Sequence, residues 1–82
     1  MLIKVLAEET DLTSATTVGS ATVVRLLNNQ AVIDQVIRKD SDSNIIGSFT
    51  LAANEVAYVE KVASDTLEGG SNIKAAKVAF TN

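Results

Sequence analysis

Acidic side chains are the main groups in this 82-residue sequence that could do chemistry. The run Asp40–Asn44 alternates oxygen-bearing side chains, which is how a calcium-binding loop begins. A calcium loop also needs Gly at its sixth position and Glu at its twelfth, where this chain has Ile45 and Leu51. The run therefore predicts a solvated turn, and we expect no metal site.

Two carboxylate pairs, Glu55 with Glu60 and Asp65 with Glu68, could share general acid and general base roles. Such pairs work when burial or a neighbour separates their pKa values and a cleft holds the substrate. A β domain of this length rarely encloses such a cleft, and Asp and Glu are mostly exposed. We therefore expect solvated carboxylates and no catalytic residues.

The sequence has no His, Cys, Pro or Trp. Without His or Cys, its serines and threonines lack the usual activating partners, and thiol chemistry and soft metal sites are excluded. The pair Gly69-Gly70 matches no phosphate-binding pattern and predicts a turn. These features predict a non-enzymatic protein without a cofactor.

Charge and hydropathy exclude two classes of partner. The net charge is −3, from 7 basic and 10 acidic side chains, which argues against a nucleic-acid ligand. No apolar run is long enough to span a bilayer, and the first residues lack the features of a signal peptide. We expect a protein made in a cytoplasm that binds neither nucleic acid nor membrane.

The fold class follows from 24 β-branched residues (Val 10, Ile 6, Thr 8) separated by turn-forming Asn, Ser and Gly. They predict an all-β fold, a small antiparallel β-sandwich or barrel of five to seven short strands, as a single domain over 1–82. The expected strands are 1–7, 21–28, 31–40, 45–52, 55–62 and 72–81.

The connections between these strands carry several further expectations. Residues 8–20 are expected to form a loop, or an extended arm with a brief strand that lies across a neighbour, and Asn28–Gln30 a tight hairpin loop. Segment 31–40 also fits an amphipathic helix, and its β-branched residues favour the strand without closing that alternative. Gly47 suggests a β-bulge, and a short helical turn is expected near 64–68, capped by Ser64 or Asp65.

Self-association is expected because the chain is short and has only one Tyr and two Phe with which to fill a core. Residues 22–27 are apolar on both strand faces, which implies either the centre of a sandwich or a surface buried by another subunit. We expect a homo-oligomer, preferably a trimer, or assembly on a larger partner. The expected assembly residues are Leu12, Val24, Leu26, Val32 and Ile37.

Segment Thr22–Thr81 resembles small accessory virion proteins of marine tailed bacteriophages, especially those that infect cyanobacteria. The resemblance rests on short segments, which are 21–26, 46–51, 54–61, 64–67 and 73–80. It departs at Ala53-Asn54, where such proteins often have Pro-Gly. The resemblance implies a virion structural protein, foremost a capsid decoration or cement protein that binds and stabilises the head lattice.

Two alternatives remain at this point. A tail or fibre-associated virion component would contact the host surface through a polar tip at Asp40–Asn44. A small phage protein that binds and inhibits a host enzyme would be a stable monomer with an exposed edge strand, expected at 31–40.

Overall fold

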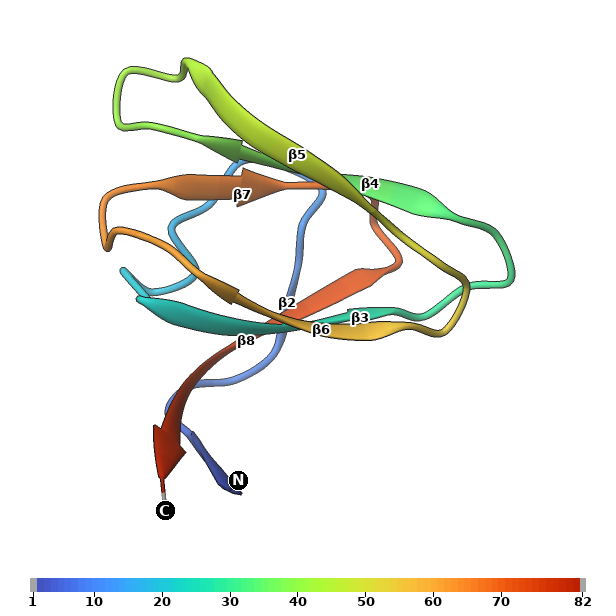
Figure 1. Ribbon diagram of the computed structural model, residues 1–82, viewed down its shortest axis with the longest axis horizontal. Helices are drawn as coiled ribbons and strands as arrows, with labels where there is room; N and C mark the ends of the chain where they lie inside the picture. Colours follow the sequence, from blue (N-terminus) through green and yellow to red (C-terminus); the bar gives the residue numbers. More distant parts are fainter. Residues whose placement is uncertain (1, 82) are drawn as a thin grey trace.

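The computed structural model describes residues 2–81, which form two antiparallel β-sheets packed face to face (Figure 1). The five-stranded sheet contains β1 (Leu2–Val5), β2 (Thr10–Asp11), β3 (Val23–Asn28), β6 (Val56–Glu60) and β8 (Ile73–Thr81). The three-stranded sheet contains β4 (Asp34–Lys39), β5 (Ile45–Leu51) and β7 (Thr66–Glu68). The predicted all-β sandwich is confirmed, with eight strands where five to seven were expected.

Strand β3 is the centre of the larger sheet, because β6 pairs with one side of it and β8 with the other. Its residues alternate between full burial and partial exposure. Val24, Leu26 and Asn28 point into the sandwich, and Val23, Arg25 and Leu27 point away from it. One of the two apolar faces of β3 is therefore buried in the chain's own core. Only the other face is available for contact with another subunit.

The core between the sheets is built from small and medium aliphatic side chains. Its fully buried members include Leu26 of β3, Val36 of β4 and Leu67 of β7, so both sheets contribute. None of the three aromatic side chains belongs to this cluster. Burial of these aliphatic groups is the main favourable term that holds the two sheets together.

Segment 8–20 is packed on the body of the molecule, so the expectation of an arm lying across a neighbour is wrong. Its short strand β2 pairs with β8, and the bridge between Thr16 and Leu67 ties it to β7. Leu12 is fully buried between these contacts. The segment thus joins the two sheets along one side of the sandwich, because its apolar residues reach the core from there.

Segment 31–40 contains a strand and no helix. Strand β4 has β5 on one side and β7 on the other, and Val36 points into the core. The helical spacing of its apolar residues is overridden by pairing on both sides, which suits β-branched side chains. The first residues of the segment, 31–33, lie outside the strand and are exposed.

The expected hairpin at Asn28–Gln30 is wrong, because β3 pairs with β6 and β8 and not with β4. The chain crosses there from one sheet to the other. The buried Asn28 side chain stabilises the crossing, since its Nδ2 donates to the carbonyls of Val32 (2.9 Å), Leu51 (3.2 Å) and Ala52 (3.1 Å).

The expected helical turn near 64–68 is also wrong. Thr66–Glu68 is strand β7, and its buried Leu67 pairs with Arg38 of β4. Asp65 does not cap a helix; its carboxylate accepts hydrogen bonds from Arg38. The β-bulge expected at Gly47 lies next to that residue, because the register places Arg38 opposite Gly47 and Lys39 opposite Ile45.

The two ends of the chain form a two-stranded ribbon. Strand β1 pairs with the last residues of β8, Val78–Thr81, which no longer pair with β3. In Figure 1 this ribbon extends from the body at the lower left, next to both termini. A two-stranded ribbon is marginally stable alone in water, so its place depends on its continuity with the sheet.

Candidate assembly surfaces

The fold leaves many large apolar side chains in water. Among residues 2–81, twelve side chains from Val, Leu, Ile, Phe and Tyr are exposed, whereas only nine Val, Leu and Ile are buried. Single exposed apolar residues are ordinary, and contiguous patches mark interaction sites. The candidate functional sites are therefore the surfaces on which these side chains gather.

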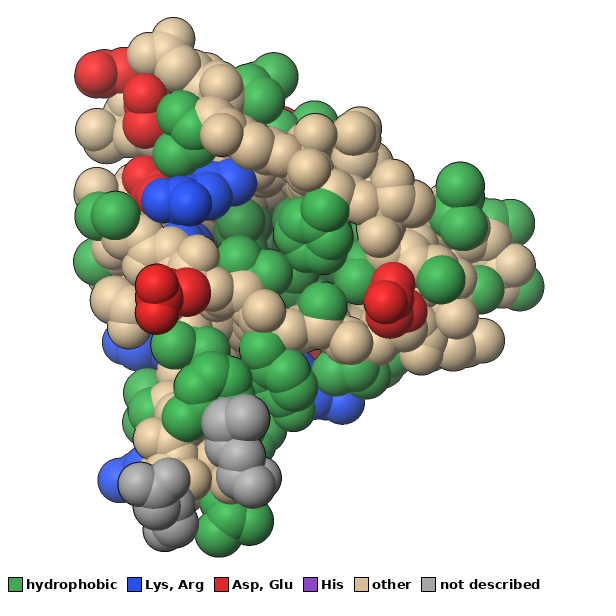
Figure 2. Space-filling view, in the orientation of Figure 1, with side chains coloured by type: hydrophobic (Ala, Val, Ile, Leu, Met, Phe, Trp, Pro, Cys, Tyr) green, Lys and Arg blue, Asp and Glu red, His purple; other side chains and the backbone are tan. Residues whose placement is uncertain are grey.

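The first surface is the β5 edge, defined here as the exposed residues 45–50. Strand β5 is the last strand of its sheet, since it pairs with β4 only. Its burial pattern shows six exposed residues followed by one buried residue, Leu51. Ile45 is 65% exposed and Ile46 is 50% exposed, so this edge strand presents apolar surface. Figure 2 shows hydrophobic side chains between this edge and the β6 edge of the other sheet.

The second surface is the outer face of the five-stranded sheet, defined by the side chains that point away from the core. Residues paired across neighbouring strands share a face. Tyr58 pairs with Arg25, and Val56 pairs with Leu27, so all four lie on this face. Phe80 joins them, because its ring centroid lies 5.4 Å from that of Tyr58. Val56, Tyr58 and Phe80 are all exposed.

Three charged positions also belong to the outer face. Arg25 and Glu60 lie on it by register, since Glu60 pairs with Val23. Lys74 pairs with Leu27 and is neutralised by Asp11, with its Nζ 2.6 Å from Asp11 Oδ1. Neither Arg25 nor Glu60 has an ion-pair partner among residues 2–81.

A hollow of about 270 Å³ lies at the beginning of β3 and the end of β6, next to Arg38 of β4. It is lined by Thr22, Val23, Arg38, Glu60, Lys61 and Val62. Ligand pockets usually span about 300–1,000 Å³ and are mostly apolar. This hollow is slightly smaller and has charged walls, so it is a weak candidate for a small-molecule site.

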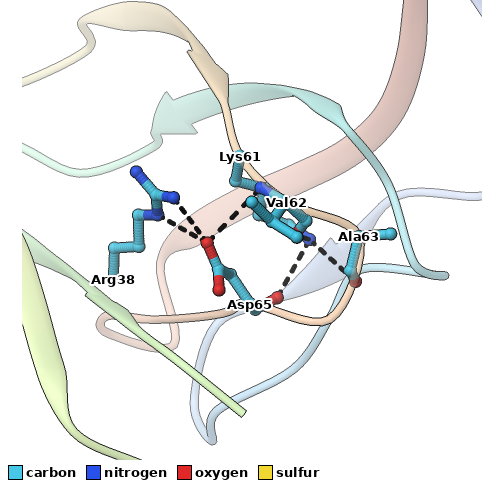
Figure 3. Close-up of polar contacts among 5 residues, drawn as sticks. All are labelled: Arg38, Lys61, Val62, Ala63 and Asp65. Atoms are coloured by element: carbon cyan, nitrogen blue, oxygen red, sulfur yellow. Dashed lines mark hydrogen bonds and ion pairs between the residues drawn. The ribbon is translucent and has the colours of Figure 1, made fainter.

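Buried polar groups beside the hollow hold the β6–β7 connection in place (Figure 3). Asp65 Oδ2 accepts hydrogen bonds from Arg38 Nε at 2.8 Å and from Arg38 Nη2 at 2.6 Å. The buried Lys61 Nζ donates to the Asp65 carbonyl at 2.9 Å and to the Val62 carbonyl at 3.3 Å. These contacts tie both side chains to the β6–β7 connection.

The environment of Lys61 changes its ionisation. Burial lowers the pKa of the Lys61 ammonium, the Asp65 carboxylate opposes this shift, and the Arg38 guanidinium adds to it. The charged form therefore costs free energy in the folded state relative to the unfolded state. This cost is present below the folded pKa and is relieved as the pH rises from the folded pKa toward 10.5.

The turn at Asp40–Asn44 is held by the Asp40 carboxylate. Its Oδ1 accepts hydrogen bonds from the backbone N–H groups of Asn44 and Asp42, both at 2.9 Å. The Asn44 N–H bond is the main cause that lowers the pKa of the Asp40 carboxyl group. Ser43 has φ +66°, a left-handed conformation that closes the turn. The carboxylate oxygens thus serve the backbone.

Three of the four carboxylates paired in the sequence analysis make structural contacts, and the fourth, Glu60, has no ion-pair partner among residues 2–81. Asp65 binds Arg38, and Glu68 Oε1 lies 2.7 Å from Lys39 Nζ. Glu55 Oε1 accepts a hydrogen bond from the Ala52 N–H at 2.8 Å, which closes the β5–β6 turn. Within residues 2–81, no group of three or more acidic side chains could hold a metal ion.

The five predicted assembly residues do not form one surface. Leu12, Val24 and Leu26 are fully buried in the core, so these three predictions are wrong as contact residues of the folded chain. Their burial has a physical reason, since the core draws on the same apolar strand faces that a partner would. Val32 is 62% exposed in the β3–β4 connection, and Ile37 is half-buried beside Ser48 and Glu68.

The surfaces that the sequence reasoning missed depend on strand order. The edge strand expected at 31–40 is instead the centre of its sheet, and β5 is the edge. Ile45 and Ile46 stand side by side in the sequence, so one of them must leave the core in any strand. These adjacent isoleucines were the one sequence feature that pointed to the exposed β5 edge.

No helix among residues 2–81 is long and apolar enough to cross a membrane.

Comparison with known proteins gives no relative: no family model, no curated protein and no solved structure matches the chain.

Proposed function

We propose that this chain is a non-enzymatic structural protein whose β5 edge docks on a larger protein lattice. The observation that carries the proposal is β5 itself, an edge strand with six of its seven residues exposed. An exposed apolar edge is a template for pairing with another chain. A strand added there would satisfy free backbone groups and cover Ile45 and Ile46 at the same time.

The resemblance of Thr22–Thr81 to accessory proteins of tailed phages supplies the setting for this role. In that setting the chain is a capsid decoration or cement protein, which binds the head lattice and stabilises it within the virion. The lack of His and Cys and the engagement of Asp65 and Glu68 in ion pairs support a role without catalysis. The partners are a capsid protein and further copies of the chain.

Co-sedimentation with heads of the phage that encodes the chain tests this function. The wild-type chain is expected to bind to saturation, with a fixed number of copies per head. Ile45→Lys places a charge on the docking edge and is expected to lower the affinity at least tenfold. The matched control is Ile33→Lys, which makes the same change at an exposed position outside the β5 edge. A wild-type chain that stays in the supernatant would overturn the proposal, as would equal binding of the two variants.

The turn at Asp40–Asn44 favours a second candidate function, a tail or fibre component that contacts the host surface. The turn is ordered by Asp40, and residues 41–44 are all exposed. In this case the chain would sediment with purified tails, and Asp42→Lys would change attachment of the particle to cells. Binding to heads alone would exclude this candidate.

A further inference from the structure

We infer that the outer face of the five-stranded sheet binds the same face of a second copy around a two-fold axis. This inference gives the proposed structural role, on which it rests, a second partner. The β5 edge would meet the lattice, and the outer face would join copies to each other.

The outer face carries apolar area that a dimer contact could bury. Val56, Tyr58 and Phe80 are exposed together on the outer face, with Leu27 half-buried beside them. A stable dimer buries roughly 800 Å² on each partner. This is about one sixth of the chain's exposed surface of 4714 Å², an area that one sheet face can supply.

The charges of the outer face favour a second copy of this chain as the partner. A two-fold interface must be complementary to itself, since the same patch occurs on both sides. Among residues 2–81, Arg25 and Glu60 are the outer-face cation and anion without an ion-pair partner, because the other cation of this face, Lys74, is paired with Asp11. A face of one sign would repel its copy, whereas this face can pair Arg25 with the copy's Glu60 twice.

The ring of Tyr58 lies near the point where a two-fold axis would cross the outer face. Tyr58 pairs with Arg25 across the sheet and lies two residues before Glu60 on β6. A two-fold axis that exchanges Arg25 and Glu60 therefore passes close to Tyr58. This places an aromatic anchor at the centre of the interface and the charged pairs on either side of it, an arrangement common in specific interfaces.

Charge exchange tests the inference. Sedimentation equilibrium over a hundredfold range of concentration is expected to show a wild-type dimer. Arg25→Glu and Glu60→Arg are each expected to raise the dimer Kd at least tenfold, because each sets like charges against each other. The double variant is expected to return to within about threefold of the wild type. Lys4→Glu is the matched control for Arg25→Glu. It makes the same change in net charge, but Lys4 points away from the outer face of the sheet.

A second measurement covers the case in which a charge variant fails to fold. The chain has no Cys, so Tyr58→Cys introduces a single thiol. Near the axis, this thiol is expected to form a disulfide-linked dimer under mild oxidation much faster than Ile33→Cys, which lies in an exposed loop.

Three outcomes would overturn the inference: a wild-type monomer or trimer at every concentration, single variants that associate normally, or a double variant that stays weakened. The proposed function is judged separately, because head binding through the β5 edge is measured with Ile45→Lys. Heads that bind the chain while Arg25→Glu has no effect on self-association would reject the dimer and keep the structural role.

Discussion

Strands β3 and β5 are both rich in large apolar residues, but they lie in opposite environments. β3 pairs with β6 and β8, and Val24 and Leu26 reach the core from it. β5 pairs only with β4, and every residue from Ile45 to Thr50 is exposed. Apolar composition therefore makes both segments strands, while the number of neighbours decides which one is buried. Of these two strands, β5 has one free edge, so it is the one that can pair with another protein.

The largest expected effect contrasts the two strands directly. Leu26→Ala leaves a cavity in the core and should lower the free energy of unfolding by about 2–5 kcal/mol. Ile45→Ala removes a side chain that is already in water, so its effect should stay within about 0.5 kcal/mol. Urea denaturation followed by circular dichroism measures both. Similar losses for the two variants would contradict the assignment of β5 to the surface.

The next largest loss of stability is expected at the connection where the chain crosses from one sheet to the other. The Asn28 side chain stabilises this crossing. Asn28→Ala removes three hydrogen bonds and leaves the carbonyls of Leu51 and Ala52 without these donors. We expect a loss of about 2–3 kcal/mol in the free energy of unfolding. Asn29→Ala is the matched control, because the Asn29 side chain is exposed. Equal urea midpoints for the two variants would show that the crossing does not depend on this amide.

A smaller effect separates the Arg38–Asp65 pair, whose carboxylate is buried, from the Lys39–Glu68 pair, in which both side chains are partly exposed. Asp65→Asn weakens the contact with Arg38, in which the Asp65 side chain is only 7% exposed, and should cost about 1–2 kcal/mol. Glu68→Gln weakens the more exposed contact with Lys39 and should cost less than about 0.5 kcal/mol. Urea denaturation gives both values. The reverse order would mean that Asp65 does not hold the β6–β7 connection.

The smallest effect is local to the turn that leads into β5. Because hydrogen bonds from Asn44 and Asp42 lower the Asp40 pKa, the turn should keep these bonds as the pH falls past 3.8. They should be lost only when the pH passes the lowered pKa. The amide NMR shifts of Asp42 and Asn44 report this titration. A midpoint at or above 3.8 would show that the carboxylate does not hold the turn.

The six longest strands were predictable from the sequence, because turn-forming residues separate runs of β-branched residues, whereas the short β2 and β7 were not. Strand β8 lies within the expected 72–81, and β3 lies within the expected 21–28. For β4 the sequence favoured a strand, since Val and Ile suit extended backbone, but its helical spacing left a helix open until the structure decided. The turn at Asp40–Asn44 follows from the ability of Asp to bind its own backbone.

The pairing of the strands was not predictable in the same way. Local signals at Asn28 and Asn29 suggest a hairpin, whereas the structure uses Asn28 to cross between the sheets. Whether Leu12 and Leu26 meet the core or a partner depends on strand order, which a single sequence does not contain. For this reason three of the five assembly residues were placed wrongly, and the exposed β5 edge was missed.

Hydrogen exchange measures directly whether the β5 edge docks on the phage head. In the free chain, the outward-facing amides of an edge strand have no partner strand and should exchange quickly. When the chain is bound to phage heads, we expect marked protection of the amides of residues 45–51, with exchange at the exposed Val32 and Ile33 unchanged. Heads that bind the chain without slowing exchange anywhere in β5 would contradict docking through this edge.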